Sequence, residues 1–150
     1  MLLSVLRTLF QRDLQKLRKE IESYQQEENI WRVAPGISNS AGNLCLHLVG
    51  NLNAYIGMEL GHSGYIRNRD LEFSARDIAK EELLQKIDAT AAIVDITLQR
   101  LSDPQLEQEY PALVFAEKTT SGHFLVHLTT HLAYHLGQIN YHRRLLDPGN

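Results

Sequence analysis

The chain has 150 residues, of which 43% are hydrophobic and 22% are charged, and its formal net charge is −3. This length and composition are typical of one compact domain with a single core, and they exclude a disordered or fibrous chain. The negative charge argues against a protein that coats nucleic acid. The single cysteine, Cys45, excludes an internal disulfide and a cysteine-rich zinc module. We therefore expect residues 1–150 to form one domain.

The sequence predicts a cytoplasmic protein with no membrane partner. No apolar run approaches the roughly 18 consecutive residues that a membrane-spanning helix requires. The apolar opening segment is interrupted by Arg7 and lacks both a basic leader and a small-residue cleavage site. A single free thiol fits the same location.

Apolar residues recur at three- and four-residue steps in four segments, which predicts four amphipathic helices. The first helix is expected from about Leu2 to Glu27, before the chain is broken at Pro35 and Gly36. The second is expected to begin after a cap at Ser38 or Asn39 and to reach about Leu60.

A long glycine-containing linker should then reach towards Ser74, followed by a third helix that continues through Leu101 and is ended by Asp103-Pro104. The fourth helix is expected over Gly122–Leu146, capped by Thr119, Thr120 or Ser121. No alternating segment long enough for a sheet competes with these helices. The fold class predicted is all-α, a four-helix bundle. Because the middle linker is too long for a tight turn, we expect a crossover that leaves the second and third helices parallel, although such a loop could also be a lid.

Four histidines of the last helix, His123, His127, His131 and His135, follow one another at four-residue spacing. Each step turns about 40° beyond a full circle, so only adjacent members can share a ligand. On a helical wheel, His131 and His135 lie nearest the apolar face, whereas His123 faces solvent.

Two imidazoles one helical turn apart can converge on a single metal ion. A third ligand is available at His47, which lies at the edge of the apolar stripe of the second helix. Three neutral imidazoles suit zinc, nickel, copper or iron, and such a site keeps open positions for water or substrate. The alternative is that these histidines are hydrogen-bonded packing residues without a metal.

The other reactive side chains are expected to have structural roles. His62 lies in a glycine-rich turn and should be a surface residue, and His142 should make a contact at the end of the bundle. Cys45 is more typical of a small buried residue than of a thiolate nucleophile.

The histidine in Leu46-His47-Leu48 and the run His131-Leu132-Ala133-Tyr134-His135-Leu136-Gly137-Gln138-Ile139 resemble the DinB/YfiT-like family of metal-dependent four-helix-bundle proteins. In that family the last helix carries His-x-x-x-His followed by Gly-Gln, usually with arginine where this chain has Leu136. The resemblance covers essentially the whole chain. It implies a metal triad at His47, His131 and His135, and up-down-down-up connectivity. It also implies a divalent transition metal, zinc or nickel foremost. Some members transfer sulfur groups with low-molecular-weight thiols such as bacillithiol or mycothiol.

Five further residues are candidates for supporting the site or binding substrate. Gln138 and Asn51 lie within two turns of the histidines on their own helices. In the linker, Tyr65 offers a stacking face, while Arg67 and Arg69 offer donors for a carboxylate or phosphate, as on a thiol cofactor. Alternatively, these arginines pair with acids on the first and third helices.

The leading hypothesis is a metal-dependent enzyme, a thiol-dependent S-transferase or a hydrolase acting on a small molecule at the three-histidine site. The alternative is a non-catalytic metal-binding bundle that acts as a structural or interaction module. A homodimer is expected in either case. Nucleic-acid binding ranks last, because the sequence pI is near 6.1 and no basic stripe is present.

Overall fold

The computed structural model describes residues 1–149 and, within them, six α-helices, four of them long, and no strand. The helices are α1 (Leu2–Glu22), α2 (Ala41–Leu52), α3 (Arg69–Ser74), α4 (Lys80–Arg100), α5 (Asp103–Leu106) and α6 (Ser121–Leu146). A 3₁₀ helix, η1 (Glu27–Trp31), follows α1, and a π-helix, η2 (Asn53–Met58), continues α2. The prediction of an all-α protein is confirmed.

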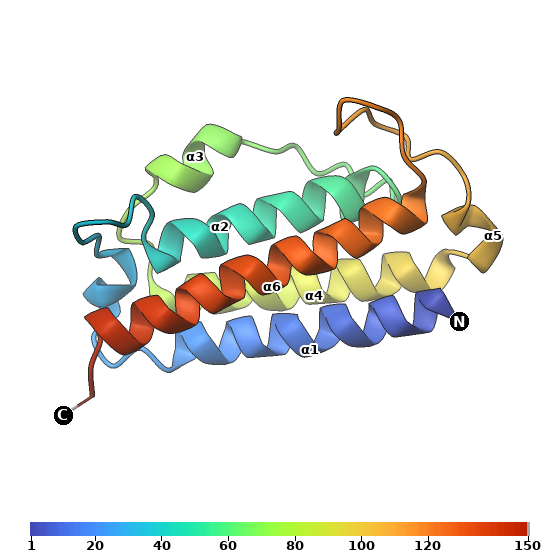
Figure 1. The fold of residues 1–150 in the computed structure, drawn as a ribbon. Coiled ribbons are helices and arrows are strands. Elements are labelled where there is room, and N and C mark those ends of the chain that lie inside the picture. Colours follow the sequence, from blue (N-terminus) through green and yellow to red (C-terminus); the bar gives the residue numbers. More distant parts are fainter. Residues whose placement is uncertain (150) are drawn as a thin grey trace.

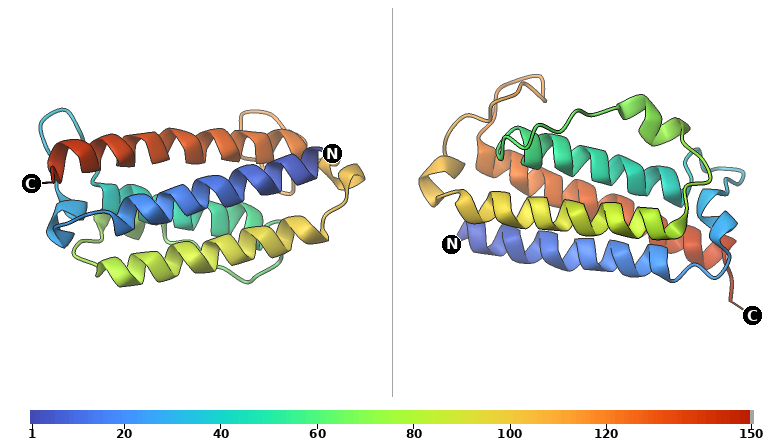
Figure 2. Two further views of the ribbon diagram at one scale, coloured as in Figure 1. Left: turned by 90° about the horizontal axis from the view of Figure 1, so that it is seen from below. Right: turned by 180° about the vertical axis from the view of Figure 1, so that it is seen from behind.

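The four long helices lie side by side, as Figure 1 and the two views of Figure 2 show. Helices α1 and α6 run in one direction, and α2 and α4 run in the other. After η2 the chain returns along the outer side of α2, through α3, before α4 begins. Helix α6 contacts both α1 and α2, and His131 lies on the face that it turns towards α2.

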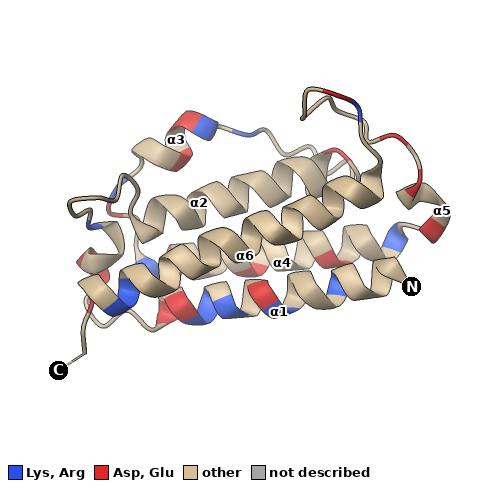
Figure 3. Cartoon of the chain, viewed as in Figure 1, with Lys and Arg blue, Asp and Glu red and all other residues tan. Residues whose placement is uncertain are grey.

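Helix α1 forms because apolar residues repeat along it at helical spacing and give it one buried face against α4 and α6. Leu6, Phe10, Leu14, Leu17 and Ile21 are each at most 2% exposed. Full burial of such a side chain stabilises the fold by about 1.5–3 kcal/mol. Its opposite face carries charges of both signs (Figure 3), some of which form ion pairs to α4, as in Arg18–Asp88.

Helix α1 ends at Glu22, five residues earlier than its apolar pattern predicts. The backbone N–H groups of Gln25 and Gln26 donate to the carboxylate of Asp147, at 2.7 and 3.1 Å. This contact with the far end of the chain turns the backbone out of the helix. The predicted extension to Glu27 is therefore wrong.

Helix α2 is almost entirely buried, and its first turn is capped by Ser40, whose side chain accepts from the N–H of Asn43 at 3.1 Å. The predicted caps Ser38 and Asn39 are wrong. Past Leu52 the winding loosens into η2, where Asn53 donates to the carbonyl of Val49. The helical path still ends near residue 60, as predicted.

Two short helices were missed by the sequence pattern, and one long helix begins later than expected. Helix α3 lies inside the predicted linker and is capped by Asn68, which accepts from the N–H of Leu71. Helix α4 begins only at Lys80. Asp103-Pro104, predicted only to end a helix, instead begins α5 behind a Ser102–Gln105 capping box.

Helix α6 begins at Ser121 and is capped by Thr120, one of the three predicted caps. Across the described residues 1–149, no helix is both long enough and apolar enough to cross a membrane.

Candidate metal centre

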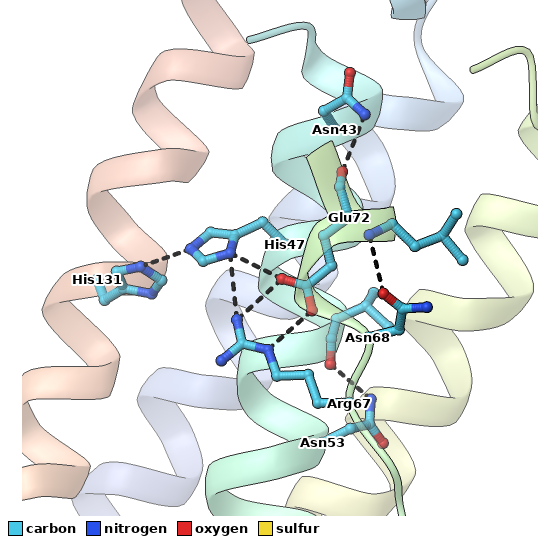
Figure 4. A network of polar contacts seen from close by, with 9 residues as sticks. Asn43, His47, Asn53, Arg67, Asn68, Glu72 and His131 are labelled. Carbon is cyan, nitrogen blue, oxygen red and sulfur yellow. Dashed lines mark hydrogen bonds and ion pairs between the residues drawn. The ribbon is translucent and has the colours of Figure 1, made fainter. Parts of the chain in front are cut away.

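Three histidines from two antiparallel helices meet between α2 and α6. His47 comes from α2, and His131 and His135 come from successive turns of α6. One ring nitrogen of each lies within 4.8 Å of the others. The Nε2 atoms of His47 and His131 are 3.1 Å apart, and Figure 4 shows the two rings pointing towards each other. The structure thus brings together the three residues that the helical wheel selected, while His123 is exposed.

The surroundings keep two of these rings neutral. Burial lowers the pKa of His131 to about 4, with smaller contributions from the neighbouring rings of His135 and His47. Burial also lowers the pKa of His135, against an opposing hydrogen bond with Gln138. Because a metal binds only the neutral form of imidazole, both rings are ready to act as ligands at neutral pH.

Hydrogen bonds at Nδ1 fix the orientation of two of the rings, so that their Nε2 atoms point towards the centre of the cluster. Nδ1 of His47 is 3.0 Å from Oε1 of Glu72, and Nδ1 of His135 is 2.7 Å from Oε1 of Gln138. Both oxygens are acceptors, so each Nδ1 carries the proton and each Nε2 keeps its lone pair. Partners of this kind orient metal-ligating histidines. Gln138, a candidate from the sequence, makes the contact with His135.

Glu72 is itself held by the linker that precedes α3. The guanidinium of Arg67 donates from Nε and Nη2 to the two carboxylate oxygens of Glu72, both at 2.9 Å (Figure 4). Burial raises the pKa of Glu72, but hydrogen bonds from His47 and Arg67 outweigh it and leave the pKa below its usual value. Arg67, Glu72 and His47 therefore form a continuous chain in which Glu72 is ionised.

The docking of Glu72 against α2 requires a glycine at position 50. A Cβ placed on Gly50 would overlap the Glu72 carboxylate, coming within 2.6 Å of its Cδ. The end of α3 is fixed separately, because the side-chain amide of Asn43 donates to the carbonyls of Glu72 and Ala75 at 3.0 and 2.9 Å. Helix α2 thus supplies both the ligand His47 and the seat for its partner.

The donor set fits a divalent ion. Nitrogens bound 2.0–2.1 Å from a tetrahedral ion lie about 3.3–3.4 Å apart, close to the 3.1 Å between Nε2 of His47 and of His131. Because the proton of the His47 ring is on Nδ1, its Nε2 can only accept. A hydrogen bond between the two rings therefore requires a proton on Nε2 of His131. A cation bound by the lone pairs of both Nε2 atoms would hold the rings together without that proton.

The other predicted linker residues have different surroundings. Arg67 does pair with an acid, but the partner is Glu72, which is not on the first or third predicted helix. Its Cζ also lies 5.5 Å from the ring centroid of Tyr55. Arg69 is exposed and Tyr65 is half-buried.

The histidines and the cysteine that the sequence analysis assigned to structural roles have surroundings of that kind. His62 is exposed in a turn, and the buried His142 contacts Tyr24 near the end of α6. Burial raises the pKa of the Cys45 thiol to about 12, so this cysteine is not a nucleophile at neutral pH.

Glu72 is the residue that sequence reasoning missed. It lies in a segment interpreted as a linker, where a six-residue helix shows no apolar period. The available signal was the cap: Asn68 followed by Asp70 and Glu72 is a helix start with acids in the first turn.

These features define an all-α protein with a three-histidine cluster that could hold a metal ion. The whole chain, residues 1–150, matches the family model described as a protein of unknown function, DUF1572. The chain belongs to this family. No curated protein matches it.

Proposed function

We propose that this DUF1572 protein is a DinB/YfiT-like, up-down-down-up four-helix bundle and a metal-dependent enzyme. The proposed activity is a thiol-dependent S-transfer on a small molecule, with hydrolysis as the related alternative. The observation that carries the metal proposal is the convergence of His47, His131 and His135 within 4.8 Å. The helix directions in Figure 1 and the terminal His-x-x-x-His-x-Gly-Gln motif support the family assignment.

A divalent zinc or nickel ion held by three imidazoles would ionise a thiol or a water molecule at neutral pH. The chain's own residues prepare the ligand set. Glu72 and Gln138 accept hydrogen bonds from Nδ1 of His47 and His135 and so direct both Nε2 lone pairs inwards. Burial keeps His131 neutral well below pH 7. Three protein ligands leave at least one position for a reactant.

Leu136 replaces the arginine that is usual at this position in the DinB/YfiT-like pattern. Its side chain is 9% exposed and belongs to the apolar core. The guanidinium that this chain places at the triad is that of Arg67, with Nη2 3.4 Å from Nδ1 of His47. Arg67 therefore places a guanidinium beside the site from the linker instead of from α6, with its charge paired to Glu72.

The test begins with the metal content of protein purified without a histidine tag. We expect about one equivalent of zinc or nickel per chain. We also expect the protein to accelerate the attack of a small thiol on an electrophile more than the free metal does. His47→Ala should remove both while the protein stays folded, because His47 adds little apolar area to the core. His123→Ala, an exposed position on α6, is the matched control.

Two results would overturn parts of the proposal separately. Absence of stoichiometric metal would remove the metal centre. Metal binding without rate acceleration across a broad set of thiols and electrophiles would instead support the non-catalytic metal-binding module. The homodimer and the cytoplasmic location stay predictions, the first of which sedimentation analysis tests directly.

A further inference from the structure

Two cavities flank the histidine triad along the groove between α2 and α6. The smaller, of about 190 Å³, is lined by His47 and His131 and extends to Asn51 and Arg69. The larger, of about 420 Å³, is lined by His135 and Gln138 and extends to the last turns of α6 and residues 34–39. Along α6 the smaller cavity contacts residues that precede the triad, such as Phe124 and His127, and the larger contacts residues that follow it, such as Tyr141 and Leu145, so the two lie on opposite sides of the triad.

The smaller cavity has a positively charged wall. Arg67 and Arg69 both line it, and no acidic side chain does. Arg67 is neutralised by Glu72, whereas Arg69 has no acidic partner within 4.0 Å among residues 1–149. One guanidinium charge is therefore left for a ligand, and guanidinium donors match a carboxylate best.

An unpaired amide lies in the same wall. Asn51 is 5% exposed, and its Oδ1 has no hydrogen-bond partner within the described chain. A buried carbonyl oxygen without a partner is costly, so native proteins rarely leave one unless a water or ligand completes it. Because Oδ1 only accepts, it is completed by a hydrogen-bond donor, whereas the free guanidinium of Arg69 favours an anionic group in the same cavity.

The larger cavity has the opposite character. No Asp, Glu, Lys or Arg lines it, and its apolar walls come from Ala34, Pro35, Ile37, Leu44, Leu145 and Leu146. Its volume falls in the range of small-molecule pockets, about 300–1,000 Å³. It therefore favours an uncharged, apolar group whose reactive end reaches His135.

We propose that the triad separates two substrate subsites: the smaller cavity binds a carboxylate-bearing group and the larger binds an uncharged apolar group. This assignment of substrate class rests on the proposed function, in which two reactants meet at the triad. It predicts that carboxylate recognition depends on Arg69, and that Arg69 does not affect binding of an apolar ligand.

The test of the smaller cavity compares acetate with its neutral isostere acetamide by NMR titration of the metal-free and zinc-loaded protein. The side-chain amide resonances of Asn51 and the Nε–H of Arg69 report on the site. We expect acetate to bind about 10- to 100-fold more tightly than acetamide, the range for a hydrogen bond to a charged group. Arg69→Gln should remove this preference, whereas Arg100→Gln, at an exposed arginine on α4, should not.

The test of the larger cavity uses toluene as the probe. Toluene should shift the resonances of Leu44 and Leu145, and Ala34→Phe should abolish these shifts by filling the cavity. Ala92→Phe, at an exposed position on α4, is the control for the added ring.

Equal binding of acetate and acetamide, an unaltered preference in Arg69→Gln, or toluene shifts away from these walls would each overturn the subsite assignment. Failure of the proposed metal chemistry is seen separately. In that case zinc does not bind, while acetate and toluene still titrate their own cavities in the metal-free protein.

Discussion

Helix α6 carries inward-facing histidines at two places, a buried one at His142 and two half-buried ones at His131 and His135, and the places differ in what the ring nitrogens contact. At His142, Nδ1 lies 2.7 Å from the hydroxyl of Tyr24, and Nε2 lies 2.8 Å from the carbonyl of Arg32. Since a carbonyl only accepts, Nε2 carries the proton and Nδ1 accepts from Tyr24. Both nitrogens are satisfied by the chain. At the triad, by contrast, the nitrogens of three rings gather at one point.

The comparison teaches that burial and pKa do not separate a structural histidine from a candidate ligand. Burial is the leading cause that lowers the pKa of His142, as it is for His131 and His135. What differs is the hydrogen-bond inventory. His142 joins the ends of α1 and α6, whereas His47 and His131 turn their Nε2 atoms towards each other within the triad.

The strongest test of this difference is to replace one histidine at each of the two places. We expect His131→Ala to abolish stoichiometric binding of zinc or nickel, because two imidazoles make only a weak site. His142→Gln and His123→Ala should retain full binding. Competition with a chromophoric chelator measures the affinities, and equal loss in all three variants would show that the triad is not the site.

The second test concerns the partner that orients His47. Glu72→Gln should weaken metal affinity by about 10- to 100-fold, the usual effect of losing a supporting carboxylate. Gly50→Ala should act in the same direction, because its methyl group would displace the Glu72 carboxylate.

Gly137→Ala is the matched control for this second test. The added Cβ meets nothing within 4 Å, so metal affinity should be unchanged. Replacing a helical glycine with alanine should also raise stability by up to about 1 kcal/mol. If Gly50→Ala and Glu72→Gln both bind metal like the unmodified protein, Glu72 does not position the ligand.

These two tests also mark what the sequence could and could not predict. The triad was predictable because helical periodicity alone fixes which histidines of α6 point towards α2. The support from Glu72 was not, because α3 depends on tertiary contacts: Asn43 anchors it, Arg67 pairs with it, and Gly50 makes room for it. The early end of α1 has the same kind of cause, since Asp147 binds the backbone there across 122 positions of sequence.

A third expectation concerns stability at the structural histidine. Tyr24→Phe removes the hydroxyl that donates to Nδ1 of His142 and should lower the free energy of unfolding by about 1–2 kcal/mol. Metal affinity should not change, because Tyr24 contacts no member of the triad through hydrogen bonds. Urea denaturation with and without zinc measures both quantities, and a Tyr24→Phe variant that loses metal would show that the two places are coupled.

The smallest effect we expect is a pH dependence that belongs to His142. Its folded-state pKa lies below the ordinary 6.5, because burial penalises the charged ring more than the hydrogen bond to Arg32 favours it. Below pH 6.5 the unfolded chain therefore binds a proton that the folded chain does not yet accept, so stability falls as the pH is lowered through this window. His131 and His135 add to the same trend, since their pKa values are also lowered. The slope of the unfolding free energy against pH measures how many protons the chain takes up on unfolding. In the metal-free protein, His142→Gln should reduce this slope between about pH 7 and pH 5 by the equivalent of less than one proton. His123→Gln, at an exposed position, should leave the slope unchanged. An identical slope in His142→Gln and the unmodified protein would mean that the ring between Tyr24 and Arg32 titrates as it does in the unfolded chain.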